Sequence, residues 1–171
     1  MLPEYIESGQ YTGRGIYSLG GKYAMSLSIR CMINITLIPG FATLETIYPP
    51  TCDLSGYYQL DSAGKKHNFT ALIHQLSSQQ RTAVTEFSDS TFRRINGVLA
   101  ESKAGVLVLG RSDDETVQIS QYWNESVSKN GFSISGIVLV NNKPPITYSV
   151  SFEMIDPEGI RSNVIRLDNS A

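Results

Sequence analysis

The sequence has few charges and few of the side chains that carry chemistry. Charged residues make up 18% of its 171 residues, the net charge is −2, and there are two histidines and two cysteines. Basic residues cluster only in the short stretches Gly64-Lys65-Lys66-His67 and Arg93-Arg94. A protein that binds phosphate backbones normally shows a basic face or arm. We therefore expect no nucleic-acid partner, which weakens the case for a genome-packaging coat protein.

Membrane and secretion signals are also lacking. No apolar run approaches the roughly 20 residues of a membrane-spanning helix. The start, residues 1–8, is acidic and lacks the apolar core of a secretory signal. We expect no membrane insertion, and a cytoplasmic chain unless a signal has been removed from it.

Catalytic and cofactor motifs are missing from the sequence. Gly13-Arg14-Gly15 follows no buried strand and opens no helix, so it is neither a dinucleotide-binding loop nor a Walker loop. There is no Gly-x-Ser-x-Gly elbow. His67 and His74 are seven residues apart, which places them on opposite faces of one strand. We therefore expect no cofactor and no enzyme.

Metal and disulfide sites have little support. Asp113-Asp114-Glu115 lacks the spaced oxygen ligands and the glycine of a calcium loop, so a solvated turn is expected and no metal. A turn at Pro39-Gly40 would place Cys31 opposite residue 48, a few positions from Cys52. A disulfide between Cys31 and Cys52 is therefore an alternative, but we favour two buried free thiols.

Apolar and polar residues alternate along residues 23–38. This alternation predicts one strand with an apolar and a polar face, roughly 50 Å long at about 3.3 Å per residue. Arg30 is the only charge on the polar face, and a long strand with so few charges is an aggregation risk at a sheet edge. We expect it to lie inside a sheet or beneath another subunit. The apolar face consists of Met25, Leu27, Ile29, Cys31, Ile33, Ile35 and Leu37.

Other short segments with strand character are separated by turn signals every eight to twelve residues. Pro39-Gly40 predicts a turn into a return strand, which Pro49-Pro50 ends. About nine or ten strands with little or no helix indicate an all-β fold, an antiparallel β-sandwich or a jelly-roll-like domain. The further predicted strands are 42–48, 57–61, 67–73, 82–87, 105–111, 116–123, 132–140, 146–154 and 160–167.

Two of these segments need comment. Residues 90–103 fit a short helix capped by Ser90, but Asn96-Gly97 between apolar residues is a strong hairpin signal. Gly97 would also weaken a helix by about 1 kcal/mol, so we favour the hairpin. The continuous apolar run within 105–111 predicts a strand buried on both faces.

The first 21 residues are rich in glycine and tyrosine. We divide the chain into an N-terminal arm, residues 1–21, and one β-sandwich domain, residues 22–171. Tyrosine and tryptophan offer a large apolar surface with a polar tip and are enriched at interfaces, and they stack on sugar rings. The candidate interface or ligand aromatics are Tyr5, Tyr11, Tyr17, Tyr57, Tyr58, Tyr122 and Trp123.

Absence of catalytic signals, Ser/Thr-rich outer faces and the ordered arm together favour a non-enzymatic structural module. The specific hypothesis is a virion component of the phage tail-fibre, baseplate or capsid-decoration type, a homo-oligomer located in the virion or in the cytoplasm before assembly. One alternative is a carbohydrate-binding or adhesin-like module that binds a surface glycan. A second alternative is an enzyme on a β-sandwich scaffold.

Overall fold

The protein is described by a computed structural model that places residues 6–61, 64–75, 82–89, 93–125 and 130–155. Within these ranges all regular structure is β-strand and no helix occurs, which confirms the all-β prediction. Among the same residues there is accordingly no apolar helix long enough to cross a membrane. The strands are β1 Gly9–Leu19, β2 Ala24–Ile38, β3 Phe41–Ala42, β4 Ile47–Tyr48, β5 Thr51–Leu60, β6 Lys66–Gln75, β7 Thr82–Asp89, β8 Arg93–Glu101, β9 Val106–Ser112, β10 Val117–Glu125, β11 Gly131–Val140 and β12 Ile146–Met154.

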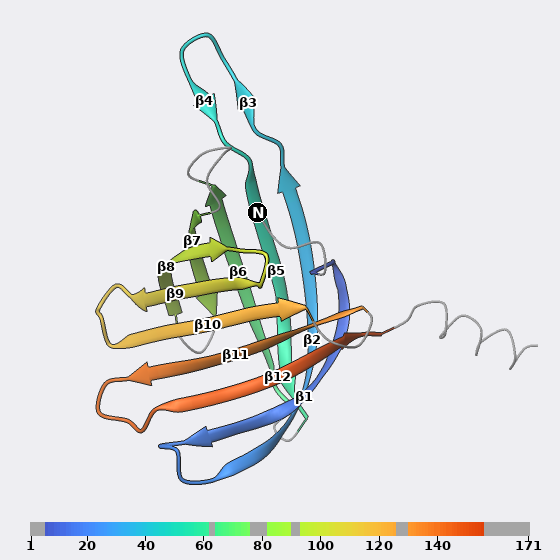
Figure 1. Ribbon diagram of the computed structural model, residues 1–171, viewed down its shortest axis with the longest axis vertical. Helices are drawn as coiled ribbons and strands as arrows, with labels where there is room; N and C mark the ends of the chain where they lie inside the picture. Colours follow the sequence, from blue (N-terminus) through green and yellow to red (C-terminus); the bar gives the residue numbers. More distant parts are fainter. Residues whose placement is uncertain (1–5, 62–63, 76–81, 90–92, 126–129, 156–171) are drawn as a thin grey trace, which may run out of the picture.

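Ten of these strands form one antiparallel sheet that curls and closes into a barrel (Figure 1). The order around it is β1-β12-β11-β10-β9-β8-β7-β6-β5-β2, and β1 hydrogen-bonds to both β12 and β2. The predicted antiparallel arrangement and strand number are thus confirmed. Side chains alternate between the inside and the outside of the barrel, so one face of every long strand supplies the core.

Strand β2 confirms the period-two prediction. It runs for 15 residues and is paired on both sides, with β1 over its first part and with β5 over its second part. Cys31 and Ile33 are buried at its centre, whereas Met25 and Leu37 lie near its ends and are exposed. The strand therefore lies inside a sheet, as expected.

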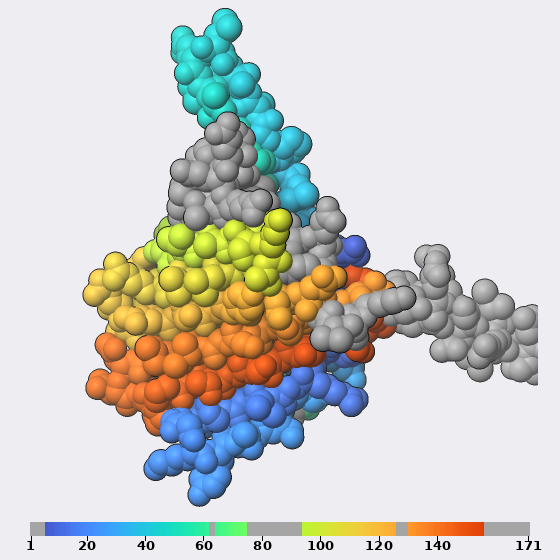
Figure 2. Space-filling model, in the orientation of Figure 1, coloured from blue at the N-terminus to red at the C-terminus, as the bar shows by residue number. Residues whose placement is uncertain are grey.

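The chain after β2 differs from the prediction. The long partner of β2 is β5 and not residues 42–48, which contribute only the two short strands β3 and β4. The reversal lies at Thr43–Thr46, beyond Pro39-Gly40. Cys31 therefore pairs with Tyr58 and not with residue 48, and both cysteines are free. The β3–β4 hairpin extends beyond the barrel (Figures 1 and 2).

Two further predictions are wrong. Residues 93–101 form the single strand β8, neither a helix nor a hairpin at Asn96-Gly97, because the whole segment pairs with β7 and β9. Strand β9 is not buried on both faces: Val106 points inward, whereas Leu107 and Leu109 are 40% and 51% exposed on the outer face. The sequence of β9 is continuously apolar because its outer face is apolar as well as its inner face.

The predicted strand 57–61 is too short, because β5 begins at Thr51. The other strand predictions agree with the structure, except that 160–167 lie outside the described residues. Residues 9–19 of the predicted arm form β1 and belong to the barrel sheet. The division of the chain into an arm and a domain, and the homo-oligomer, stay predictions.

Aromatic rings fill one end of the barrel core. Phe132 is 1% exposed and packs against Tyr11, Trp123 and Phe152, with ring centroids 5.1, 5.4 and 5.0 Å away. The cross-strand neighbour of Phe152 on β1 is Gly13. A Cβ atom at Gly13 would lie 2.7 Å from the Phe152 ring, so the ring lies over the glycine. The four rings therefore form one contiguous aromatic cluster.

Substitution of Phe132 by alanine should remove about 3–5 kcal/mol from the free energy of unfolding, because it leaves a cavity among three rings. Urea denaturation followed by circular dichroism measures the change. Leu107→Ala, on the outer face, is the control and should stay within about 0.5 kcal/mol of the parent. Equal losses in both variants would contradict the assignment of Phe132 to the core.

Candidate functional site

The barrel encloses a cavity of about 120 Å³. Its wall is apolar apart from the side chains of Gln121 and Trp123. An engineered apolar cavity of about 150 Å³ binds one benzene ring, so this space suits a small ring or a branched aliphatic group. Apolar lining residues include Leu54, Ala71, Ile73, Leu99, Val106 and Val108.

Small residues on neighbouring strands contribute to the cavity wall. Gly97 of β8 and Gly110 of β9 are paired directly, and both contribute to the wall. Ala71 adds a third short side chain from β6. Ile6 contributes from the chain before β1 and is 6% exposed. The segment that precedes the first strand therefore closes part of the cavity.

Three polar side chains form a hydrogen-bonded chain inside the barrel, and two of them, Gln121 and Trp123, line the cavity. Trp123 Nε1 donates a hydrogen bond of 3.1 Å to Gln121 Oε1, and Gln121 Nε2 donates to Tyr148 Oη. An indole N–H can only donate, so the amide oxygen of Gln121 must face Trp123. The phenol oxygen of Tyr148 accepts from Gln121, which leaves the Tyr148 O–H as a donor.

Tyr148 keeps that proton over a wide pH range. Burial raises its pKa to about 12, while the hydrogen bond from Gln121 acts in the opposite direction and is smaller. The phenol is therefore neutral at physiological pH and can donate to an oxygen acceptor. The Tyr148 O–H is thus a donor that the hydrogen bonds of Trp123 and Gln121 leave for a ligand.

Register explains how Tyr148 reaches Gln121. Gln121, Gly136 and Tyr148 stand side by side on β10, β11 and β12. Because Gly136 has no side chain, the Tyr148 ring crosses β11. A Cβ atom at Gly136 would lie 2.6 Å from Tyr148 Oη. Glycine at this position is therefore required for the contact.

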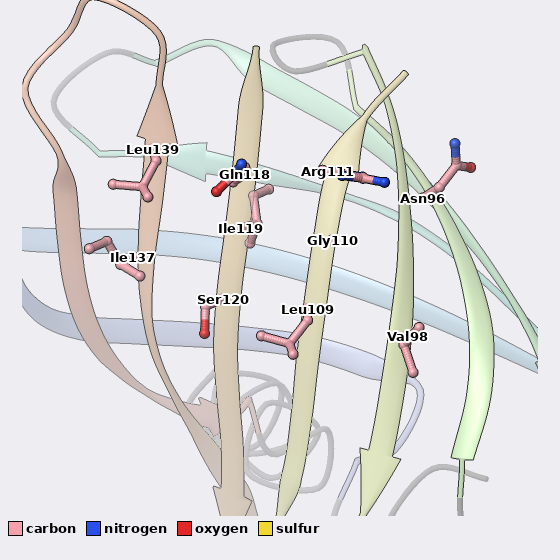
Figure 3. A pocket seen from close by; sticks show the side chains of 10 residues that line it. All are labelled: Asn96, Val98, Leu109, Gly110, Arg111, Gln118, Ile119, Ser120, Ile137 and Leu139. Atoms are coloured by element: carbon pink, nitrogen blue, oxygen red, sulfur yellow. The ribbon is translucent and has the colours of Figure 1, made fainter. Parts of the chain in front are cut away.

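A second concavity, of about 380 Å³, lies on the outer face of strands β8–β11 (Figure 3). We call it the outer groove. Two neighbouring cross-strand rows form its sides. One row is Val98, Leu109, Ser120 and Ile137, and the other is Asn96, Arg111, Gln118 and Leu139. Arg111 is the only charged residue among those that line it, and it forms a 3.4 Å ion pair with Glu115.

The predicted interface aromatics do not form one surface. Tyr5 lies outside the described residues. Tyr11 is 1% exposed and Trp123 belongs to the core. Consecutive residues alternate in a strand, so Tyr57 and Tyr58 face opposite sides of the sheet, as do Tyr122 and Trp123.

The polar tips of several of these tyrosines have partners in the chain. Tyr11 Oη donates 2.7 Å to the Glu7 carbonyl, and Tyr122 Oη donates 2.8 Å to the Ala104 carbonyl. Tyr58 stacks on His67, and Lys66 Nζ lies 4.4 Å from the Tyr57 ring centroid. Tyr17 is half-buried on β1, opposite Tyr148. Only Trp123 of the set lines the cavity.

The other sequence candidates are separate from the cavity and from the outer groove. Neither His67 nor His74 lines either of them. Among the described residues no group of histidine, cysteine or carboxylate side chains could hold a metal ion. Asp114 accepts hydrogen bonds from Ser112 and Thr116, which lower its pKa to about 2, so it organises the turn before β10. Burial raises the pKa of both cysteines, Cys31 to about 12, so neither is a reactive thiolate.

Sequence reasoning missed Gln121, Tyr148 and the paired glycines. Gln121 was the one polar residue on the inward side of an otherwise apolar strand, next to Trp123. That exception to the alternation was the available signal. The pairing of Gly97 with Gly110 depends on the register between β8 and β9, which the sequence does not contain.

No protein-family model and no curated protein sequence matches this chain. Among solved structures, it is similar to the S-type phycobiliprotein lyase CPES from Guillardia theta. The TM-score is 0.57, the sequence identity is 10%, and the match covers 88% of each chain. At this identity the similarity shows a common fold.

This comparison contradicts the functional prediction. The fold is shared with a lyase, so the virion interpretation, with its tail-fibre, baseplate and decoration variants, is corrected, as is the prediction that the protein is not an enzyme. The physical reason for the error lies inside the barrel. The sequence search looked for charged and nucleophilic motifs, whereas the site consists of neutral side chains around an internal space.

Substitution Tyr148→Phe should lower the free energy of unfolding at pH 7 by about 1–3 kcal/mol, because Gln121 loses a buried acceptor. The pKa of Tyr148 is about 12 in the folded protein and 10 for the free side chain. The protonated phenol therefore contributes its full stabilisation below pH 10, and this contribution is lost as the pH rises through about 12. The gap between parent and variant should therefore narrow between pH 10 and pH 12. Urea titrations at several pH values measure it, and a gap independent of pH would contradict the buried phenol.

Proposed function

We propose that the protein binds an apolar, ring-bearing ligand with an oxygen acceptor inside the barrel. The observation that carries this proposal is the directed chain Trp123–Gln121–Tyr148 in an apolar interior. Ligand sites of proteins are mostly apolar concavities with a few polar groups that fix orientation. The ligand ring packs against the aliphatic wall, and its oxygen reaches past Gln121 to accept from the O–H of Tyr148, which does not itself line the cavity.

Cavity size sets a limit on the ligand. About 120 Å³ accommodates roughly one ring, by comparison with the benzene-binding cavity of about 150 Å³. A larger ligand reaches the same wall only if Ile6 moves out, because that side chain fills part of the interior. Ligands of several rings should therefore displace the segment before β1.

The chemical class we favour is a linear tetrapyrrole pigment. Such a pigment combines apolar rings with carbonyl oxygens, and the similar solved structure is that of a phycobiliprotein lyase. A role in pigment attachment is the second candidate, and the shared fold is its only support. If the pigment is attached to a cysteine thiol, that thiol belongs to another protein, because burial keeps Cys31 and Cys52 protonated.

Biliverdin serves as a test ligand, and Trp123 serves as the reporter because it is the only tryptophan. Binding should quench Trp123 fluorescence and shift the absorption of the pigment. Ala71→Leu fills the cavity and should weaken binding at least tenfold. Ala100→Leu, a matched substitution on the outer face of β8, should leave affinity within twofold. Equal effects of the two variants, or no binding by the parent, would overturn the interior site.

Tyr148→Phe tests the hydrogen bond to the ligand. The variant should bind biliverdin about tenfold more weakly, which corresponds to about 1.4 kcal/mol. Tyr122→Phe removes a phenol on the outer face and is the control. An unchanged affinity in Tyr148→Phe, with retained binding by the parent, would show that the phenol does not recognise the ligand.

A further inference from the structure

The β3–β4 hairpin carries an unusually apolar surface. Six large side chains between the end of β2 and Tyr48 are exposed, and Leu44 at the tip is fully exposed, at 108%. Contiguous apolar patches of more than a few hundred Å² mark interaction sites. The six side chains are Leu37, Ile38, Phe41, Leu44, Ile47 and Tyr48.

The hairpin has a defined structure of its own. Phe41 and Tyr48 stack with ring centroids 4.5 Å apart. At the tip, Thr43 Oγ1 accepts hydrogen bonds from the backbone N–H groups of Glu45 and Thr46, and the Thr43 N–H donates to the Thr46 carbonyl. The turn thus satisfies the backbone N–H groups of Thr43, Glu45 and Thr46. It can enter an apolar groove without leaving these groups unpaired.

The outer groove is the complementary surface. Val98, Leu109 and Leu139 are 51%, 51% and 40% exposed along its two rows. Its volume of about 380 Å³ is more than twice that of a cavity that holds one benzene ring, so it has room for about two apolar side chains. The apolar side chains of the groove and of the hairpin point away from the barrel interior. Among the described residues, no other part of the chain covers them.

The charges of the two surfaces also correspond. Glu45 is the only charged residue between residues 37 and 50, and Arg111 is the only one among those that line the groove. Arg111 already pairs with Glu115, but a guanidinium group has five donors and can bind two carboxylates. The neighbouring Asp113 accepts from Asn96, and Asp114 is engaged within its turn.

We propose that the β3–β4 hairpin of one copy of the protein docks into the outer groove of a second copy. The hairpin projects away from the barrel body and from strands β9–β11 (Figures 1 and 2), so it does not reach the groove of its own chain. Leu44 and Ile47 enter between the two rows, and Glu45 meets Arg111. This interface is independent of the proposed ligand site.

The contact is heterologous, because the two surfaces are different. A heterologous contact forms a ring when the rotation closes and a longer assembly when it does not. A lipid surface is the less favoured partner of the hairpin. Glu45 at the tip is costly to bury in hydrocarbon, and no Lys or Arg lies between residues 37 and 50 to attract anionic lipid.

Complementary variants test the proposal by analytical ultracentrifugation. The parent should show concentration-dependent association. Leu44→Asp disables the hairpin and Leu109→Asp disables the groove, and each variant alone should sediment as a monomer. An equimolar mixture should form a heterodimer, since one intact hairpin and one intact groove remain. Ile16→Asp, at another exposed apolar position on β1, is the control and should associate like the parent. Circular dichroism checks that every variant is folded.

A charge exchange tests the register of the contact. Glu45→Arg and Arg111→Glu should each weaken association, and the double variant should recover most of it. A monomeric parent at high concentration would overturn the proposal. Association that is abolished by Leu44→Asp but unchanged by Leu109→Asp would also overturn it. A third contrary result is Leu44-dependent binding to phosphatidylcholine vesicles without self-association.

Discussion

Closure of the sheet through β1 is the constraint on which the rest of the structure depends. β1 hydrogen-bonds to β12 along one edge and to β2 along the other, so it joins the last described strand of the barrel to the second. Closure removes the free edges that an open sheet of this size would present. It also fixes the register around the ring, because a slip of one residue in any pair would turn an apolar face outward.

A fixed register decides which side chains become neighbours inside the barrel. Gly13 lies beside Phe152, and Gly136 lies beside Tyr148, so in each case a ring covers the space that a glycine leaves. Gly110, which pairs with Gly97, is covered by an aliphatic side chain instead, since a Cβ atom there would lie 2.7 Å from Ile95 Cγ2. The packing of the rings in the interior is therefore set by which residues the register places beside the glycines.

The fold could be predicted from local patterns to a considerable extent. Alternation located β2 and β12, and turn residues separated most of the other strands. The hairpin signal Asn96-Gly97 failed because pairing along both edges of β8 outweighs a local turn preference. The site could not be predicted, since Gln121 and Tyr148 are 27 residues apart and meet only through the register of three strands.

The length of β2 links the barrel to its projecting hairpin. Pairing with β1 ends at Ile33, whereas pairing with β5 continues to Ile38. Beyond Ile33 one edge of β2 would be open, but the Ile35 N–H donates to Ser8 Oγ, and Pro39 lacks an N–H group. The chain before β1 thus covers the edge as well as part of the cavity. Apolar side chains beyond Ile35 have left the barrel interior, so the exposure of Leu37 and Ile38 follows from a strand that is longer than the barrel it helps to build.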